Sequence, residues 1–130
     1  MAEGTGPKAG TIAWHDLTAS DAGKLGEFYA AVVGWRAEPV DMHGYADYNM
    51  LAPATGEPVA GVCHARGPNA GLPAQWLIYV LVESLEASLR ACVERGGRIV
   101  DGPRGMGEQV FAVIRDPAGA HLALIGPPRK

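Results

Sequence analysis

The side chains in this chain best suited to acid–base chemistry are the carboxyl group of Asp16 and the imidazoles of His15 and His64. A carboxyl group and an imidazole that meet in a dry cavity can act as base and acid, because partial burial raises the pKa of the carboxyl group toward neutrality. The sequence does not show that Asp16 and His64 meet. The alternative for Asp16 is a hydrogen bond to a neighbouring loop amide, which is the commoner role of an Asp at a strand end.

The elements that position these residues are predicted from hydrophobic period and turn residues. Residues 11–18 have the composition of a strand, and Ser20 or Asp21 can cap a helix that ends at Gly34. The spacing i, i+3, i+4 and i+7 predicts one apolar stripe on this helix, formed by Leu25, Phe28, Tyr29 and Val32. Three further strands are expected, near residues 37–40, 45–51 and 59–65.

The second half of the chain repeats this order. Residues 75–82 predict a strand, Ser84 a helix cap, and Gly96 and Gly97 the end of the helix. One face of this helix is expected to carry Leu85, Ser88, Leu89, Cys92 and Val93. Strands are expected at residues 98–100, 109–115 and 120–125, with PRGMGE at 103–108 as a mobile connection.

The repeated unit is βαβββ, and glycines at matching places in both halves support it. We therefore predict an α+β fold in one domain over residues 1–130, with a first module at about 11–66 and a second at about 74–126. One such unit would leave a curved sheet with an open concave face. Pairing two units would close that face into a pocket, with the helices on the convex side.

Composition excludes several classes of partner. The net charge is −3 and the 11 Lys and Arg residues are scattered, which argues against nucleic acid and against an anionic membrane surface. No apolar run reaches the roughly 18 residues of a bilayer span, and the first ten residues lack the apolar region of a secretory signal. We expect a cytoplasmic protein in which Cys63 and Cys92 are reduced core thiols.

Five segments carry a resemblance to a known superfamily: WHDLTASD, FYAAVVGW, GEPVAGV, ERGGRIV and DPAGAHLAL. Together they make the chain similar to the vicinal oxygen chelate superfamily, which includes glyoxalase I, extradiol dioxygenases and bleomycin-resistance proteins. The likeness covers nearly the whole chain, and it specifies the fold more than the reaction. It also implies a homodimer as the expected assembly.

The resemblance implies metal ligands on the first and last strand of each module. Counting from the helix starts and from the turn glycines, those positions fall on Trp14, Ala60, Leu77 and Ala123. An indole, a leucine and two methyl groups offer no ligand to a divalent ion. The prediction is therefore a domain with no metal and no other cofactor. The alternative is a divalent metal in a displaced site that uses His15 and His64.

Strand alternation then indicates which side chains line the pocket. If Trp14 faces inward, Asp16 does so as well, and His64 would share the inward face with Ala60 and Val62, whereas His15 would point toward the helices. We assign Asp16 and His64 as candidate catalytic residues, and the candidate substrate-binding residues are Trp14, Tyr48, Gln75, Tyr79 and Arg66. Each has a simpler alternative: Gln75 and Tyr79 can satisfy each other, and Arg66 can be merely solvated.

Three functions follow. The first is a binder of a small-molecule ligand, or a lyase or isomerase of the glyoxalase-like class that works without metal. The second is a metal-dependent enzyme similar to lactoylglutathione lyase or the dioxygenases, built on the displaced site. The third is a module that serves only dimerisation or scaffolding.

Overall fold

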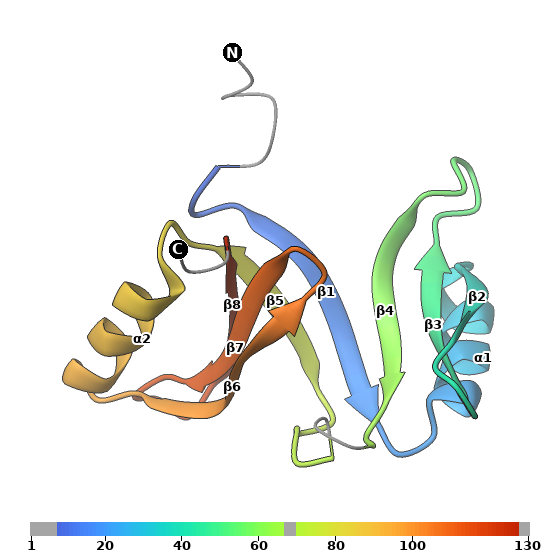
Figure 1. The fold of residues 1–130 in the computed structure, drawn as a ribbon. Helices are drawn as coiled ribbons and strands as arrows, with labels where there is room; N and C mark the ends of the chain where they lie inside the picture. Colours follow the sequence, from blue (N-terminus) through green and yellow to red (C-terminus); the bar gives the residue numbers. More distant parts are fainter. Residues whose placement is uncertain (1–7, 67–69, 128–130) are drawn as a thin grey trace. The chain divides into compact units, whose positions relative to one another are not determined.

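The computed structural model describes residues 8–66 and 70–127 and divides into two compact units (Figure 1). One unit is Trp14–Trp76, here called the first module. The other, the second module, joins the residues before Trp14 to those from Leu77 onward. The early residues belong there because they hydrogen-bond to its backbone: Gly10 N donates to Leu81 O at 2.7 Å, and Leu81 N donates to Thr11 O at 2.9 Å.

The first module is a four-stranded sheet with one helix. Its strands have the order β2-β3-β4-β1, with β4 and β1 parallel and the other neighbours antiparallel. Along the chain the elements are β1 (Ile12–Ala19), α1 (Ala22–Val33), β2 (Arg36–Asp41), β3 (Ala46–Leu51) and β4 (Pro58–His64). These bounds lie within two residues of those predicted.

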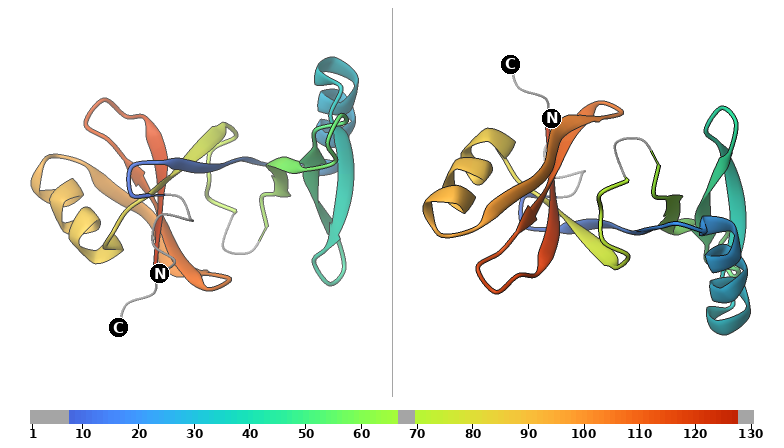
Figure 2. Two further views of the ribbon diagram at one scale, coloured as in Figure 1. Left: turned by 90° about the horizontal axis from the view of Figure 1, so that it is seen from above. Right: turned by 90° about the horizontal axis from the view of Figure 1, so that it is seen from below.

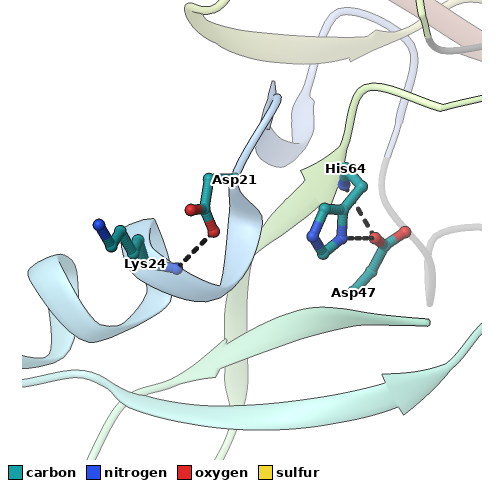
Figure 3. Close-up of polar contacts among 4 residues, drawn as sticks. All are labelled: Asp21, Lys24, Asp47 and His64. Atoms are coloured by element: carbon teal, nitrogen blue, oxygen red, sulfur yellow. Dashed lines mark hydrogen bonds and ion pairs between the residues drawn. The ribbon is translucent and has the colours of Figure 1, made fainter.

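The ends of α1 follow the predicted signals. Asp21 is the N-cap, and its Oδ1 accepts a hydrogen bond from Lys24 N at 3.1 Å (Figure 3). Gly34 is the C-cap with φ of 90°, in the left-handed region that glycine adopts most readily, and its N–H donates to Ala30 O.

The apolar stripe predicted for α1 is only half correct. Phe28 and Val32 are 53% and 64% exposed, whereas the residues that α1 buries are Ala22 and Gly26. The buried line passes through Gly26 because the ring of Tyr48 lies against it, 3.8 Å from where a side-chain carbon would be. The small residues set the helix close to the sheet, and the large apolar residues beside them face outward.

The second module repeats the same topology. Its strand order is β5-β8-β7-β6, with β5 and β8 parallel, as β1 and β4 are in the first module, and with the other neighbours antiparallel. The elements are β5 (Trp76–Leu81), α2 (Leu85–Glu94), β6 (Arg98–Met106), β7 (Gln109–Arg115) and β8 (His121–Gly126). Figure 2 shows each helix beside the strands of its own module. The predicted α+β fold of two βαβββ modules is confirmed.

The core of the second module lies between α2 and its sheet. Leu85 and Leu89 of α2 pack against the sheet residues Ala112, Ile114 and Leu124. Ser84 caps the helix, with its Oγ accepting from Ala87 N at 3.1 Å. Neither α1 nor α2 is long and apolar enough to cross a bilayer, and the rest of the described chain contains no such helix.

The prediction of a mobile connection at 103–108 is wrong. Strand β6 continues to Met106 and pairs with β7, with register shifts between Ile99 and Asp101 and between Asp101 and Arg104. Arg104 Nε donates to Asp101 Oδ2 at 3.0 Å, and its guanidinium lies 4.7 Å from the centroid of the Phe111 ring. These side-chain contacts hold an irregular strand that turn residues alone would mark as a loop.

Candidate functional site

Helix α1 covers one face of the first module's sheet. The residues packed on this side include Met50 of β3 and Ala60 and Val62 of β4, which are at most 2% exposed. The prediction that Ala60 and Val62 line the ligand pocket is therefore wrong. The cause is a β-bulge: Met50 pairs with Ala60 but Leu51 pairs with Pro58, so β4 holds one extra residue and its alternation shifts.

The opposite face of this sheet carries Trp14, Asp16, Asp47, Gly61 and Cys63, and we call it the Asp16 face. Gly61 is paired directly with Asp16. A side-chain carbon on Gly61 would lie 3.2 Å from Asp16 Cβ and 3.6 Å from two atoms of the Trp14 indole. Trp14 and Asp16 thus lie over a bare stretch of β4 backbone.

Burial of charged and polar groups is concentrated here. Among the residues that the structure describes, the buried polar ones are Asp16, Thr18 and Asp47, which are 7%, 4% and 7% exposed. Asp16 and Thr18 alternate with Leu17 on β1. Asp47 alternates with Tyr48, whose ring packs against α1, so the Asp47 carboxylate lies on the Asp16 face. Buried carboxylates are costly unless they are hydrogen-bonded, so this clustering requires a structural or functional reason.

The Asp47 carboxylate contacts His64, the last residue of β4. Its Oδ1 accepts a hydrogen bond from the backbone N–H of His64 at 2.9 Å and lies 3.3 Å from His64 Nδ1 (Figure 3). When Nδ1 is the donor in this contact, Nε2 of a neutral imidazole is left as an acceptor. The carboxylate thereby fixes the position of the strand end and the orientation of the imidazole together.

Cys63 lies between the two buried carboxylates. The pKa of its thiol is raised to about 12, chiefly by burial and also by the charges of Asp16 and Asp47 and by a hydrogen bond with Asp47. The thiol therefore stays protonated at neutral pH, and it is a donor rather than a nucleophile.

Two further side chains extend this cluster. The Tyr45 ring meets the His64 ring edge-on, with centroids 5.5 Å apart, and the Arg66 guanidinium lies 4.0 Å above the Tyr45 ring. Arg66 is exposed and His64 is half-buried. A line of contacts therefore runs from an exposed cation to the buried Asp47 through one tyrosine and one histidine.

Comparison with known proteins identifies the family. The profile of the glyoxalase-like domain family matches residues 13–125. The chain belongs to the glyoxalase-like domain family. This glyoxalase-like chain is also 30% identical to the anthracycline biosynthesis protein DnrV of Streptomyces peucetius over 130 residues, with 88% of the chain covered. It spans 46% of DnrV, so it is about half as long as that relative.

Solved structures match at the level of the fold. Methylmalonyl-CoA epimerase from Mycobacterium tuberculosis aligns with a TM-score of 0.53 and 18% identity, over 93% of the glyoxalase-like chain and 90% of that protein. NAD-dependent benzaldehyde dehydrogenase from Legionella pneumophila aligns with a TM-score of 0.58 and 13% identity, over 88% and 98% of the two chains. These similarities support the fold predicted from the sequence resemblance.

The strand positions that the family uses for a divalent metal do not fit one in this chain. The pairing of Gly61 with Asp16 in the first module matches that of Ala123 with Tyr79 in the second, so the last-strand positions are Gly61 and Ala123. Neither residue has a metal-binding atom, and the first-strand residues Trp14 and Leu77 have none either. The described residues also contain no group of three His, Cys, Asp or Glu side chains placed to hold an ion.

The displaced pair of histidines is not brought together. His64 is paired with Ala19, and His15 lies four residues before Ala19, about 13 Å along an extended strand. His15 is exposed and alternates with Trp14 and Asp16, so it belongs to the helix side of β1.

The remaining candidate residues have mixed positions. Tyr48 packs against α1 and does not face Asp16, which corrects its assignment as a ligand-binding residue; Asn49 next to it shares the Asp16 face. Gln75 is half-buried just before β5. Tyr79 is 4% exposed, and its ring centroid lies 6.0 Å from that of Phe111. A depression of about 530 Å³ in the second module includes none of the predicted site residues.

Sequence reasoning missed Asp47 and Tyr45 as members of this cluster and treated Cys63 as an ordinary core thiol. Asp47 lies within the strand predicted at residues 45–51, but the sequence does not give the phase of that strand, so it does not show which of its side chains share a face with Asp16. The useful signal is that Asp47 alternates with the aromatic Tyr48. Because Tyr48 is suited to pack against the apolar side of the helix, Asp47 is expected on the opposite face of the strand.

Proposed function

We propose that this domain binds a small organic ligand on the Asp16 face of the first module and that Asp16 and His64 transfer protons to and from that ligand without a metal ion. The observation that supports this proposal is the burial of Asp16 and Asp47 on one face of one sheet, beside Cys63 and His64.

The residues have distinct roles in this proposal. Asp16 is the base, because it is a buried carboxylate on the face where the paired residue, Gly61, has no side chain. Asp47 is a positioning residue that holds Nδ1 of His64, and Nε2 of His64 exchanges a proton with the ligand. Taking a proton at one atom of the ligand and returning one at another is an isomerisation with no net change of oxidation state. When His64 instead gives its proton to a leaving group while Asp16 takes one from the ligand, the same pair performs a lyase reaction.

The Trp14 indole suggests the ligand's shape. It is half-buried and lies beside Asp16 over Gly61, where a flat or apolar ligand can contact its ring. The similarity to an anthracycline biosynthesis protein is compatible with an aromatic ligand, and the structural match to an epimerase is compatible with proton transfer. Arg66, exposed above Tyr45, supplies a positive charge for an anionic group.

The expected test is a ligand screen by thermal shift with aromatic, quinone-like and thiol-conjugate compounds. A compound that raises the midpoint for the unaltered chain should bind about tenfold more weakly to Asp16→Asn, because the ionised acceptor is lost. Glu27→Gln is the matched control, since Glu27 is an exposed carboxylate on α1. Equal affinity of Asp16→Asn and the unaltered chain for every binding compound would contradict the proposed site.

A contact surface for a second copy of the chain is the second candidate. The exposed Phe28 and Val32 side chains on α1 favour it, because exposed large apolar neighbours often mark protein interfaces. The homodimer expected from the resemblance would bury them. Sedimentation should then give a dimer for the unaltered chain and a monomer for Phe28→Ser/Val32→Ser; a monomer in both cases would contradict it.

A further inference from the structure

Three basic side chains form a row across the second module's sheet. Arg98 of β6 is paired directly with Arg115 of β7, and Arg115 is paired directly with His121 of β8. The three strands lie side by side in Figure 1. Directly opposed residues lie on the same face of a sheet, with their Cβ atoms about 5 Å apart. The side chains of Arg98 and Arg115 therefore leave the sheet from neighbouring positions on one face.

A depression of about 220 Å³ adjoins this pair. It is lined by Gly96 at the end of α2, by the two arginines, and by the β7–β8 turn from Asp116 to Gly119. The Arg115 side chain lies over the turn, with its Nη2 3.5 Å from where a side-chain carbon on Gly119 would be. The absence of a side chain at Gly119 therefore gives the guanidinium room beside the depression.

The carboxylate that lines the depression, Asp116, is hydrogen-bonded to the backbone of the turn. Asp116 Oδ1 accepts hydrogen bonds from Ala118 N at 2.8 Å and Ala120 N at 3.0 Å. Within residues 8–66 and 70–127, ion pairs are found for His64 with Asp47 and for Arg104 with Asp101, and for neither Arg98 nor Arg115. Both arginines are exposed, so their charges are available at the surface.

Like charges directly opposite each other in a sheet repel, and the pairing is therefore unfavourable without a counter-ion. An anion that accepts from both guanidinium groups would remove the repulsion and form charge-assisted hydrogen bonds. The planar fork of arginine matches the oxygens of phosphate and carboxylate groups in particular.

We propose that Arg98 and Arg115 form an oxyanion-binding site at the β7–β8 turn of the second module, which takes the phosphate or carboxylate group of a small ligand. The site is separate from the Asp16 face, because all of its residues belong to the second module. It does not depend on the proposed function.

The test uses the full chain with inorganic phosphate and with succinate, each compared with sodium chloride at the same ionic strength. Phosphate or succinate should raise the thermal midpoint, and calorimetry should give a saturable affinity. Arg98→Gln and Arg115→Gln should each weaken that affinity at least about tenfold. Arg90→Gln is the matched control, because Arg90 is an exposed arginine of α2 outside the depression, and it should retain the affinity.

Two more measurements distinguish binding at this site from a general effect of charge and from binding at the Asp16 face. In low salt without phosphate, Arg98→Gln should be at least as stable as the unaltered chain, because a repulsive neighbour is removed. Asp16→Asn should keep the phosphate response. A response to phosphate alone would assign a phosphate group, and a response to succinate alone a carboxylate. Equal effects of phosphate, succinate and chloride, or full affinity in both glutamine variants, would overturn the proposal.

Discussion

The chemistry of the Asp16 face is set by individual neighbours. Asp47 contacts both Cys63 and His64, so the same carboxylate orients an imidazole and adds to the burial that keeps the thiol protonated. A carboxylate in contact with a protonated thiol and an N–H is stabilised by hydrogen bonds where water is excluded. These hydrogen bonds explain how the Asp47 carboxylate remains buried.

Cys63 should be unreactive in the folded protein. With its pKa raised to about 12 by burial and the two carboxylates, the thiolate fraction at pH 8 is very small. In a Cys92→Ser variant, which leaves Cys63 as the one thiol of the chain, iodoacetamide should alkylate the folded protein at least about tenfold more slowly than the urea-unfolded protein. Mass spectrometry measures both rates. The Cys63→Ser variant, which keeps Cys92, is the control for general accessibility.

The same pKa predicts a direction for stability against pH. Well below pH 9 the thiol is protonated in the folded and unfolded states, so Cys63 contributes no pH dependence there. Between pH 9 and 12 the unfolded chain releases the proton and the folded protein retains it, so the free energy of unfolding falls as the pH rises. Cys63→Ser should show a shallower loss of stability over this range. An identical slope in both proteins would show that the thiol pKa is not raised.

At the scale of the elements, glycines decide how closely each helix lies to its sheet. A side-chain carbon at Gly26 in α1 would be 3.7 Å from Ala37 Cβ and 3.8 Å from the Tyr48 ring, which is ordinary contact. At Gly97, just after α2, it would be 2.6 Å from Cys92 Sγ and 2.9 Å from Arg115 O, which is a clash.

The two glycines should therefore respond oppositely to alanine. Gly26→Ala should stabilise the protein by about 0.5–1 kcal/mol, because alanine has the higher helix propensity and fits the space. Gly97→Ala should destabilise it by roughly 1–3 kcal/mol, because backbone atoms must move. Urea unfolding of both variants measures the differences. Destabilisation by Gly26→Ala would show that the contact between α1 and β3 is tighter than described.

The elements themselves were predictable because local signals mark their ends. Asp21, Gly34 and Ser84 cap as their residue types indicate, since caps depend on backbone groups within a few residues. The phase of β4 was not predictable, because the bulge between Met50 and Leu51 depends on pairing with another strand. That single residue moved the last-strand position from Ala60 to Gly61 and placed Ala60 and Val62 against the helix.

At the scale of the whole molecule, two modules with one topology have acquired different chemistry. The first-module position Gly61 faces a buried acid, Asp16, while the equivalent Ala123 in the second module faces Tyr79. The repeat predicted from the sequence thus specifies the backbone of both modules. It does not specify which module holds polar groups, because that depends on single side chains on otherwise equivalent strands.

A divalent metal should therefore leave the stability of the full chain unchanged. A metal present at 100 times its dissociation constant would add about 2.7 kcal/mol to the free energy of unfolding, which raises the midpoint of a domain of this size by on the order of 10 °C. We expect a change under about 1 °C with Ni²⁺, Zn²⁺, Mn²⁺ or Fe²⁺ after treatment with a chelator, since Trp14, Gly61, Leu77 and Ala123 offer no metal-binding atom. A metal-dependent member of the family, measured alongside, provides the positive control. A saturable shift of several degrees with one ion bound per chain would show that other residues form a metal site, and His64→Gln would then test whether His64 is one of its ligands.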